Sequence, residues 1–82
     1  MRTYYNEWGE QIAKRIRKAR EEAGLTVDEL AWLIHRSKST LRKYEYGEKV
    51  PSIDAIIEIA EETNVSIDWL VGRKGCKRKH WN

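Results

Sequence analysis

The chain of 82 residues can form one domain around a single compact core, and its one cysteine, Cys76, excludes an internal disulfide and suits a reducing compartment. It has no apolar run long enough to cross a bilayer, and its first seven residues lack the apolar segment of a signal peptide, so we expect a cytoplasmic protein with no membrane partner. The net charge of +3 is modest and by itself excludes no class of partner.

The spacing of apolar residues is helical along most of the chain, without strand-like alternation. Helices are predicted at residues 8–23, 27–34, 38–46, 53–63 and 67–71. Each of the last four follows a residue whose hydroxyl can cap it: Thr26, Ser37, Ser52 and Ser66. Residues that can end a helix stand at Gly24, Gly47, Asn64 and Gly72. The sequence therefore predicts an all-α protein of five short helices.

The second and third predicted helices are separated by only about three residues. So short a link makes two helices cross steeply, as they do in a helix-turn-helix unit. The second helix of such a unit projects from the body of the domain and can enter the major groove of DNA. The sequence thus favours residues 38–46 as a recognition helix.

The third predicted helix has two different faces. Leu41 and Tyr44 are expected to point toward the core, which leaves an outer face with no acid, formed by Lys38, Ser39, Arg42 and Lys43. Lysine and arginine can donate to guanine O6 and N7, and serine can pair with several base edges. Basic helix faces are common, so an ordinary solvated face remains the alternative on this stretch alone.

Charge is unevenly spread along the chain. Residues 36–49 hold five bases against two acids, whereas residues 53–68 hold five acids and no base. Residues 73–82 hold five bases and no acid, show no periodic apolar pattern, and are expected to be a mobile tail. A molecule polarised in this way suits a polyanionic partner better than its net charge suggests, although an ordinary solvated surface remains possible.

Several segments in order carry a resemblance to a known family: TVDELA (26–31), SKSTL (37–41), YEYG (44–47), PS (51–52) and VSIDWL (65–70). Together they resemble the phage-repressor and Cro type of helix-turn-helix, the XRE family. The resemblance implies a compact five-helix lambda-repressor-like DNA-binding domain at residues 12–72, between an aromatic extension at 1–11 and the basic tail at 73–82. It also implies a transcriptional regulator, a repressor, that binds double-stranded DNA at a palindromic operator as a homodimer.

The same resemblance assigns roles to individual residues. It places base reading on Lys38, Ser39 and Lys43, with Arg42 beside them. Phosphate contacts are expected from Thr26, Ser37, Thr40, Tyr46 and Lys49. A structural ion pair is expected between Arg20 and Glu45. A dimer interface is expected from Val50, Ile53, Ile67, Trp69 and Val71, and the alternative is that these residues face the core, as Trp69 is expected to do in part.

Three positions depart from the family pattern. Val27 stands where the family often has a glutamine that touches phosphate, so that contact is not expected here. His35 stands where the turn usually has glycine; histidine tolerates positive φ better than most residues. Arg36 replaces an apolar residue, so either the backbone shifts slightly or Arg36 reaches a phosphate.

Trp32 is unusual because the second helix of the family normally carries a polar side chain there. Our expectation is that the N-terminal aromatic residues Tyr4, Tyr5 and Trp8 fold back and cover it, since an exposed tryptophan is costly. The alternative is that Trp32 belongs to a surface for a protein partner.

Two other classes of function compare less well with the sequence. An antitoxin-type interaction module on the same fold is the alternative to a DNA-binding regulator, but the short basic segment at 75–82 is not the arm that such a role requires. An enzyme is not expected, because the chain has no Gly-rich phosphate loop and its thiol and imidazoles lie in the turn or the tail. His35, His80 and Cys76 stand at no zinc spacing, so neither a metal, a cofactor nor a small-molecule ligand is expected.

Overall fold

The computed structural model describes residues 7–72, with side chains from residue 9 onward. Its helices are α1 (Glu7–Glu22), α2 (Val27–Leu33), α3 (Lys38–Glu45), α4 (Ile53–Thr63) and α5 (Ile67–Leu70), and no strand occurs in this range. The predicted all-α fold is confirmed; α4 has both predicted ends, and the other helix ends differ by at most one residue. None of these helices is long and apolar enough to cross a membrane. The basic tail, with Cys76 and His80, lies outside the described residues, as do Tyr4 and Tyr5.

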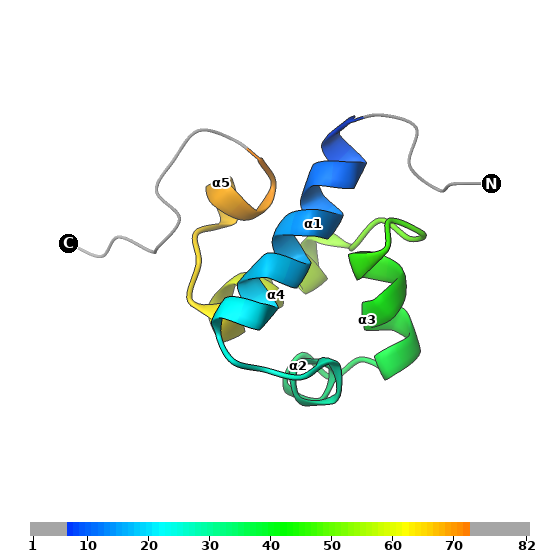
Figure 1. Ribbon diagram of the computed structural model, residues 1–82, viewed down its shortest axis with the longest axis vertical. Helices are drawn as coiled ribbons and strands as arrows, with labels where there is room; N and C mark the ends of the chain where they lie inside the picture. The colour runs from blue at the N-terminus through cyan, green and yellow to red at the C-terminus, as the bar shows by residue number, and fades with distance from the viewer. Residues whose placement is uncertain (1–6, 73–82) are drawn as a thin grey trace.

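Helix α1 is the central helix of the domain. It packs against α3, α4 and α5, while α2 packs against α3 and α4. Figure 1 shows α3 and α5 on opposite sides of α1, with α2 across the end of the molecule where α1 finishes. This arrangement leaves the side of α3 that faces away from α1 open to solvent.

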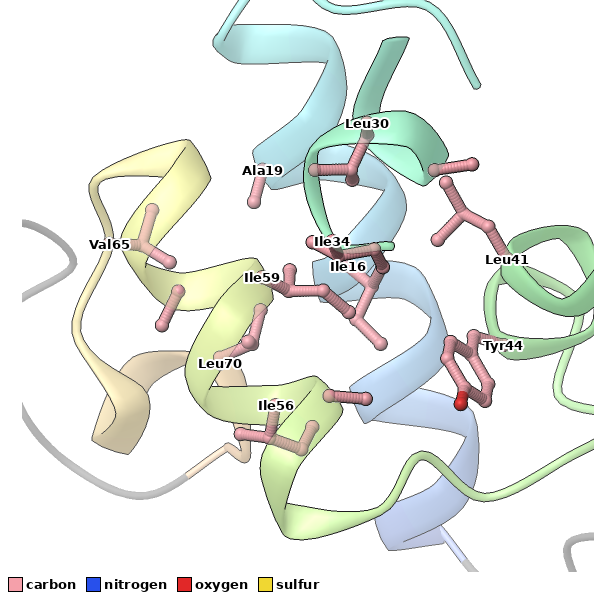
Figure 2. Close-up of a cluster of buried hydrophobic side chains, with 13 residues drawn as sticks. Ile16, Ala19, Leu30, Ile34, Leu41, Tyr44, Ile56, Ile59, Val65 and Leu70 are labelled. Carbon is pink, nitrogen blue, oxygen red and sulfur yellow. The ribbon is translucent and has the colours of Figure 1, made fainter. Parts of the chain in front are cut away.

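The core forms where these helices meet, and Figure 2 shows its side chains converging between α1, α2, α3 and α4. The largest fully buried side chains are Ile16, Leu30, Ile34, Leu41, Ile59 and Leu70. Burying a side chain of this size is worth roughly 1.5–3 kcal/mol relative to leaving it exposed. Because Leu30, Ile34 and Leu41 come from the helix-turn-helix segment, the core fixes that segment on the rest of the domain.

Side-chain caps determine where the helices begin. The hydroxyls of Thr26, Ser37, Ser52 and Ser66 accept hydrogen bonds from the backbone N–H groups of Glu29, Thr40, Ala55 and Trp69, respectively. At Thr26 the capping box is complete, because the Thr26 N–H also donates to the Glu29 carboxylate at 2.8 Å. A cap of this kind typically contributes about 1 kcal/mol, so all four predicted helix starts have a local energetic basis.

Within residues 7–72, two residues other than glycine adopt the left-handed conformation, at the positions where the sequence offered residues that tolerate it. Asn64 ends α4 with φ 59° and ψ 43°, and His35 in the link between α2 and α3 has φ 59°. The left-handed conformation costs most L-residues roughly 1–2 kcal/mol, although histidine and asparagine adopt it more often than others. His35 is therefore a turn residue, and its conformation allows α3 to leave α2 at a steep angle.

Substitutions at His35 test this conformation. His35→Val is expected to lower the free energy of unfolding by about 1–2 kcal/mol, because a β-branched residue is strained at positive φ. His35→Gly should leave the free energy of unfolding nearly unchanged, because the relief of strain is offset by the greater freedom of glycine in the unfolded chain. Urea denaturation measures both variants. A valine variant as stable as the glycine variant would contradict a left-handed His35.

The expectation for Trp32 was wrong. Its side chain is 77% exposed on α2. Figure 1 places α2 at the end of the molecule opposite to the first turn of α1, which carries Trp8. Trp32 is therefore a large apolar side chain on the surface.

Candidate nucleic-acid interface

The link between α2 and α3 has a defined backbone. The N–H of His35 donates to Trp32 O at 3.1 Å, and the N–H of Arg36 donates to Ala31 O at 2.9 Å. Ser37 then caps α3, with its Oγ accepting from the Thr40 N–H at 3.0 Å. These bonds engage two of the last carbonyls of α2 and one of the first amides of α3, so the link between the two helices is ordered as a helix-turn-helix unit.

Helix α3 presents the two faces that the sequence predicted. Leu41 and Tyr44 are buried, whereas Lys38, Ser39, Arg42 and Lys43 are exposed. These four exposed residues, together with Tyr46 and Glu48, line one shallow depression on the surface. The candidate base-reading residues therefore share one solvent-accessible face, which we call the outer face of α3.

Arg20 and Glu45 form the ion pair expected behind α3. Arg20 Nε donates to Glu45 Oε2 at 2.7 Å and Nη2 donates to Oε1 at 3.1 Å, a bidentate arrangement. Only 13% of the Arg20 side chain and 4% of the Glu45 side chain are exposed. Arg20 Nη1 also donates to Leu25 O at 3.0 Å, so one guanidinium connects the end of α3 to the loop before α2.

The hydrogen bond to Glu45 raises the pKa of the Arg20 guanidinium above its ordinary value, with burial opposing and the charge of Glu45 adding to the effect. A group whose folded pKa is raised contributes stability below its unfolded pKa, and that stability is lost only as the pH passes the folded pKa. For arginine both values lie above any ordinary working pH. The pair should therefore retain the charge of Arg20 throughout that range.

The candidate phosphate-contacting residues lie around the starts of α2 and α3 and at the end of α3. Thr26 and Ser37 are exposed N-cap residues, and Tyr46, the C-cap residue of α3, is 65% exposed. Thr40 is half-buried, and its Oγ1 accepts a hydrogen bond from the Ser37 hydroxyl at 2.9 Å. Helix N-termini attract anions, because their first N–H groups and the helix dipole both favour negative charge.

Arg36 has a role that the sequence reasoning missed. Its Nη1 donates to Glu58 Oε1 on α4 and to Ile34 O, both at 2.8 Å. The apolar residue that the family often has here is therefore replaced by an ion pair that holds the turn against α4. With Arg36 engaged in this way, its predicted phosphate contact would require the pair to open.

Lys38 has a neighbour that bears on its predicted role. Its Nζ lies 3.4 Å from Asp28 Oδ1 on α2, and both side chains are largely exposed. An exposed pair of this kind contributes little to stability. The pair can therefore open at little cost when Lys38 meets another partner.

The helix-turn-helix geometry agrees with a family model. The HTH_3 model, described as helix-turn-helix, matches residues 16–70, which include all of α2, α3, α4 and α5. The chain belongs to the HTH_3 family. This family is the XRE type that the sequence resembled.

Relatives of this HTH_3 chain include named transcriptional regulators. The HTH-type transcriptional regulator ImmR of Bacillus subtilis is 30% identical over 69 residues, which cover 84% of this chain and 54% of ImmR. The cryptic phage CTXphi transcriptional repressor RstR of Vibrio cholerae is 33% identical over 63 residues, which cover 77% of this chain and 56% of RstR. The chain thus spans about half the length of these curated relatives.

Solved structures confirm the fold of this HTH_3 domain. The N-terminal DNA-binding domain of SinR from Bacillus subtilis matches with a TM-score of 0.72 at 30% identity, covering 79% of this chain and 96% of that one. A SinR structure in complex with DNA matches with a TM-score of 0.68 at 32% identity, covering 72% and 95% of the two chains.

The residues expected at a dimer interface of this HTH_3 domain divide into two groups. Val50, Ile53 and Ile67 are 55%, 65% and 41% exposed. Trp69 and Val71 are half-buried and pack against the core, and the Trp69 ring lies under the Arg15 guanidinium at 5.0 Å. The sequence reasoning missed Ile57, which is 41% exposed one turn after Ile53 on α4. Ile53 and Ile57 stand four residues apart, so they share a face of α4.

Proposed function

We propose that this chain binds double-stranded DNA in a sequence-specific manner as a transcriptional regulator, a repressor, in the cytoplasm. The observation that carries the proposal is the outer face of α3, where three cations and a serine are exposed on a helix whose opposite side is buried. A helix of this kind can enter the major groove, which is wide enough to admit it. The relatives named as regulators and repressors support the assignment.

The proposed contacts divide into two kinds. Bases would be read by the outer face of α3, namely Lys38, Ser39, Arg42 and Lys43. Phosphates would be bound around this face by Thr26, Ser37, Thr40, Tyr46 and Lys49, which set the position of the helix on the duplex. Arg36 is a weaker candidate for phosphate because it already pairs with Glu58.

Selection from a library of random duplexes tests the proposal. The purified chain should enrich one sequence, and binding to that sequence should exceed binding to unrelated duplex by about 10³-fold or more. The affinity should also fall steeply with salt, because Lys and Arg contacts release counterions from the phosphates. Equal binding to every duplex would contradict sequence-specific recognition.

The chain is further proposed to act as a symmetric homodimer. A monomer would place one recognition helix in one major groove, whereas a two-fold dimer reaches half-sites roughly 34 Å apart. The surface that we propose for the dimer contact, the apolar patch, is made of the exposed residues Val50, Ile53, Ile57 and Ile67, on the loop before α4, on α4 and on α5. Because α4 packs against α5, these side chains lie on adjoining elements. Exposed apolar residues grouped in this way are typical of an interaction surface.

Ile53→Asp tests the proposed dimer. Ile53 is the first residue of α4 after the cap Ser52, a position where a carboxylate suits the helix dipole, so the monomer should fold as before. Sedimentation should then show weak dimers for the unchanged chain and for Trp32→Asp, which removes an exposed apolar residue elsewhere, but only monomers for Ile53→Asp. One protomer per palindromic duplex at saturating protein would contradict the dimer.

A further inference from the structure

A second basic surface lies on α1, next to the end of α3. Lys14 and Arg17 line a depression with Tyr46 and Gly47, at the point where α3 ends. Tyr46 also lines the depression over the outer face of α3, so the two depressions share that side chain. Figure 1 shows α1 running past the end of α3 that leads into the following loop. A ligand that covers the outer face of α3 and Tyr46 thus reaches the α1 surface next.

The cations of α1 divide into engaged and available groups. Arg20 is paired with Glu45, and Arg15 donates to Trp69 O at 3.0 Å while it stacks over the Trp69 ring. Lys14 and Lys18 are exposed and Arg17 is half-buried, and within residues 7–72 none of the three has an ion-pair partner. Of these three, only Lys14 and Arg17 line the depression.

The acids that also line this α1 depression are Glu10 and Glu45. Glu45 is already neutralised by the bidentate contact with Arg20. Once Glu45 is set against Arg20, the lining holds two cations, Lys14 and Arg17, and one other carboxylate, Glu10. The depression therefore has a net positive charge. Lysine, arginine and tyrosine side chains, all present in the lining, are groups that bind phosphate oxygens.

We propose that Lys14 and Arg17 bind backbone phosphates of DNA that flank the half-site read by α3. The inference rests on the proposed DNA binding and adds a second segment of the chain to it. Lys14 and Arg17 stand three residues apart and about 4.5 Å apart along the helix axis, so they project from one side of α1. Phosphates of one strand recur about every 3.4 Å along the duplex axis, so the two long side chains can serve neighbouring phosphates.

The double variant Lys14→Gln/Arg17→Gln tests this role, because glutamine removes each charge but keeps much of the side chain. Lys18→Gln is the matched control: Lys18 is exposed on the same helix and does not line the depression. On the duplex selected by the unchanged chain, the slope of log K against log salt should decrease by about 1.8 for the double variant. That change corresponds to roughly 60-fold weaker binding at 0.1 M salt, and the control should keep its slope.

Phosphate ethylation interference locates the contact. With the unchanged chain, ethylation of phosphates just outside the half-site should weaken binding, and this effect should disappear with the double variant. If the unchanged chain binds its selected duplex but the double variant has the slope and interference pattern of Lys18→Gln, the α1 contact is wrong while DNA binding stands. If the unchanged chain binds no duplex, the proposed function and this contact both fail.

Discussion

Replacing Glu45 with alanine is expected to lower the free energy of unfolding by about 3–5 kcal/mol. Both side chains of the Arg20–Glu45 pair are largely withdrawn from solvent, with 13% and 4% exposed. Without the carboxylate, Arg20 would keep its hydrogen bond to Leu25 O but lose both contacts to Glu45. The carboxylate that then remains near the guanidinium is that of Glu21, whose exposed side chain lies 4.0 Å from Arg20 Nη2. A buried charge that loses its main partner is costly, because its lost hydration is poorly replaced.

Two variants separate this effect from a general loss of charge. Glu62→Ala removes an exposed carboxylate from α4 and should barely change the urea midpoint. Arg20→Met/Glu45→Leu replaces both partners with apolar side chains and should be clearly more stable than Glu45→Ala. Equal denaturation midpoints for Glu45→Ala and Glu62→Ala would show that the pair does not hold α3 in place.

Lys43→Ala and Lys38→Ala are each expected to weaken binding to the selected duplex by about 1–3 kcal/mol, as the loss of a good base contact would. Binding to unrelated duplex should weaken less, because only the specific complex places these side chains against base edges. Neither substitution should unfold the domain, since both lysines are exposed and the Lys38–Asp28 pair is a surface one.

Fluorescence anisotropy with the selected duplex and with a scrambled duplex measures specific and non-specific binding, respectively. Lys18→Gln on α1 removes a cation away from the outer face of α3 and serves as the control for net charge. If Lys43→Ala loses the same binding free energy on both duplexes, Lys43 contacts a phosphate instead of a base.

The parts of the fold that were predictable are those determined by neighbours in sequence. Thr26 with Glu29 and Ser37 with Thr40 are contacts over three residues, so the pattern of residue types already indicates the helix starts. The left-handed conformations of His35 and Asn64 follow likewise from local backbone requirements. The predicted ends of α2, α3 and α5 were one residue late because Ile34, Tyr46 and Val71 are C-cap residues whose N–H groups still bond to the helix.

Features that depend on distant contacts could not be predicted in the same way. The Arg36–Glu58 pair joins residues 22 apart in sequence, and nothing in the local pattern connects them. Trp32 is exposed on α2, which lies at the end of the molecule opposite to the first turn of α1. The sequence pattern predicts the helices but not how they are arranged in space. The exposure of Ile57 had a signal, since α4 carries more apolar residues than one buried face can hold: Ile53, Ala55, Ile56, Ile57, Ile59 and Ala60.

The candidate interface was predictable to an intermediate degree. The outer face of α3 follows from helical periodicity once Leu41 and Tyr44 are placed inward. The Arg20–Glu45 pair was expected from the family resemblance, and the structure shows it as two hydrogen bonds of 2.7 and 3.1 Å. The basic residues of α1 required the structure, because only the fold brings Lys14 and Arg17 beside Tyr46.

Selection of bound sites from random duplexes, performed in parallel with the unchanged chain, Lys43→Ala and Lys38→Ala, tests most directly whether the outer face of α3 reads DNA sequence. The unchanged chain should enrich one palindromic sequence with half-sites about 10 base pairs apart, centre to centre. Lys43→Ala should enrich the same sequence except for one position in each half, where its preference is lost. If Lys43→Ala and Lys38→Ala both enrich the same sequence as the unchanged chain, with the same preference at every position, the outer face of α3 does not read the bases.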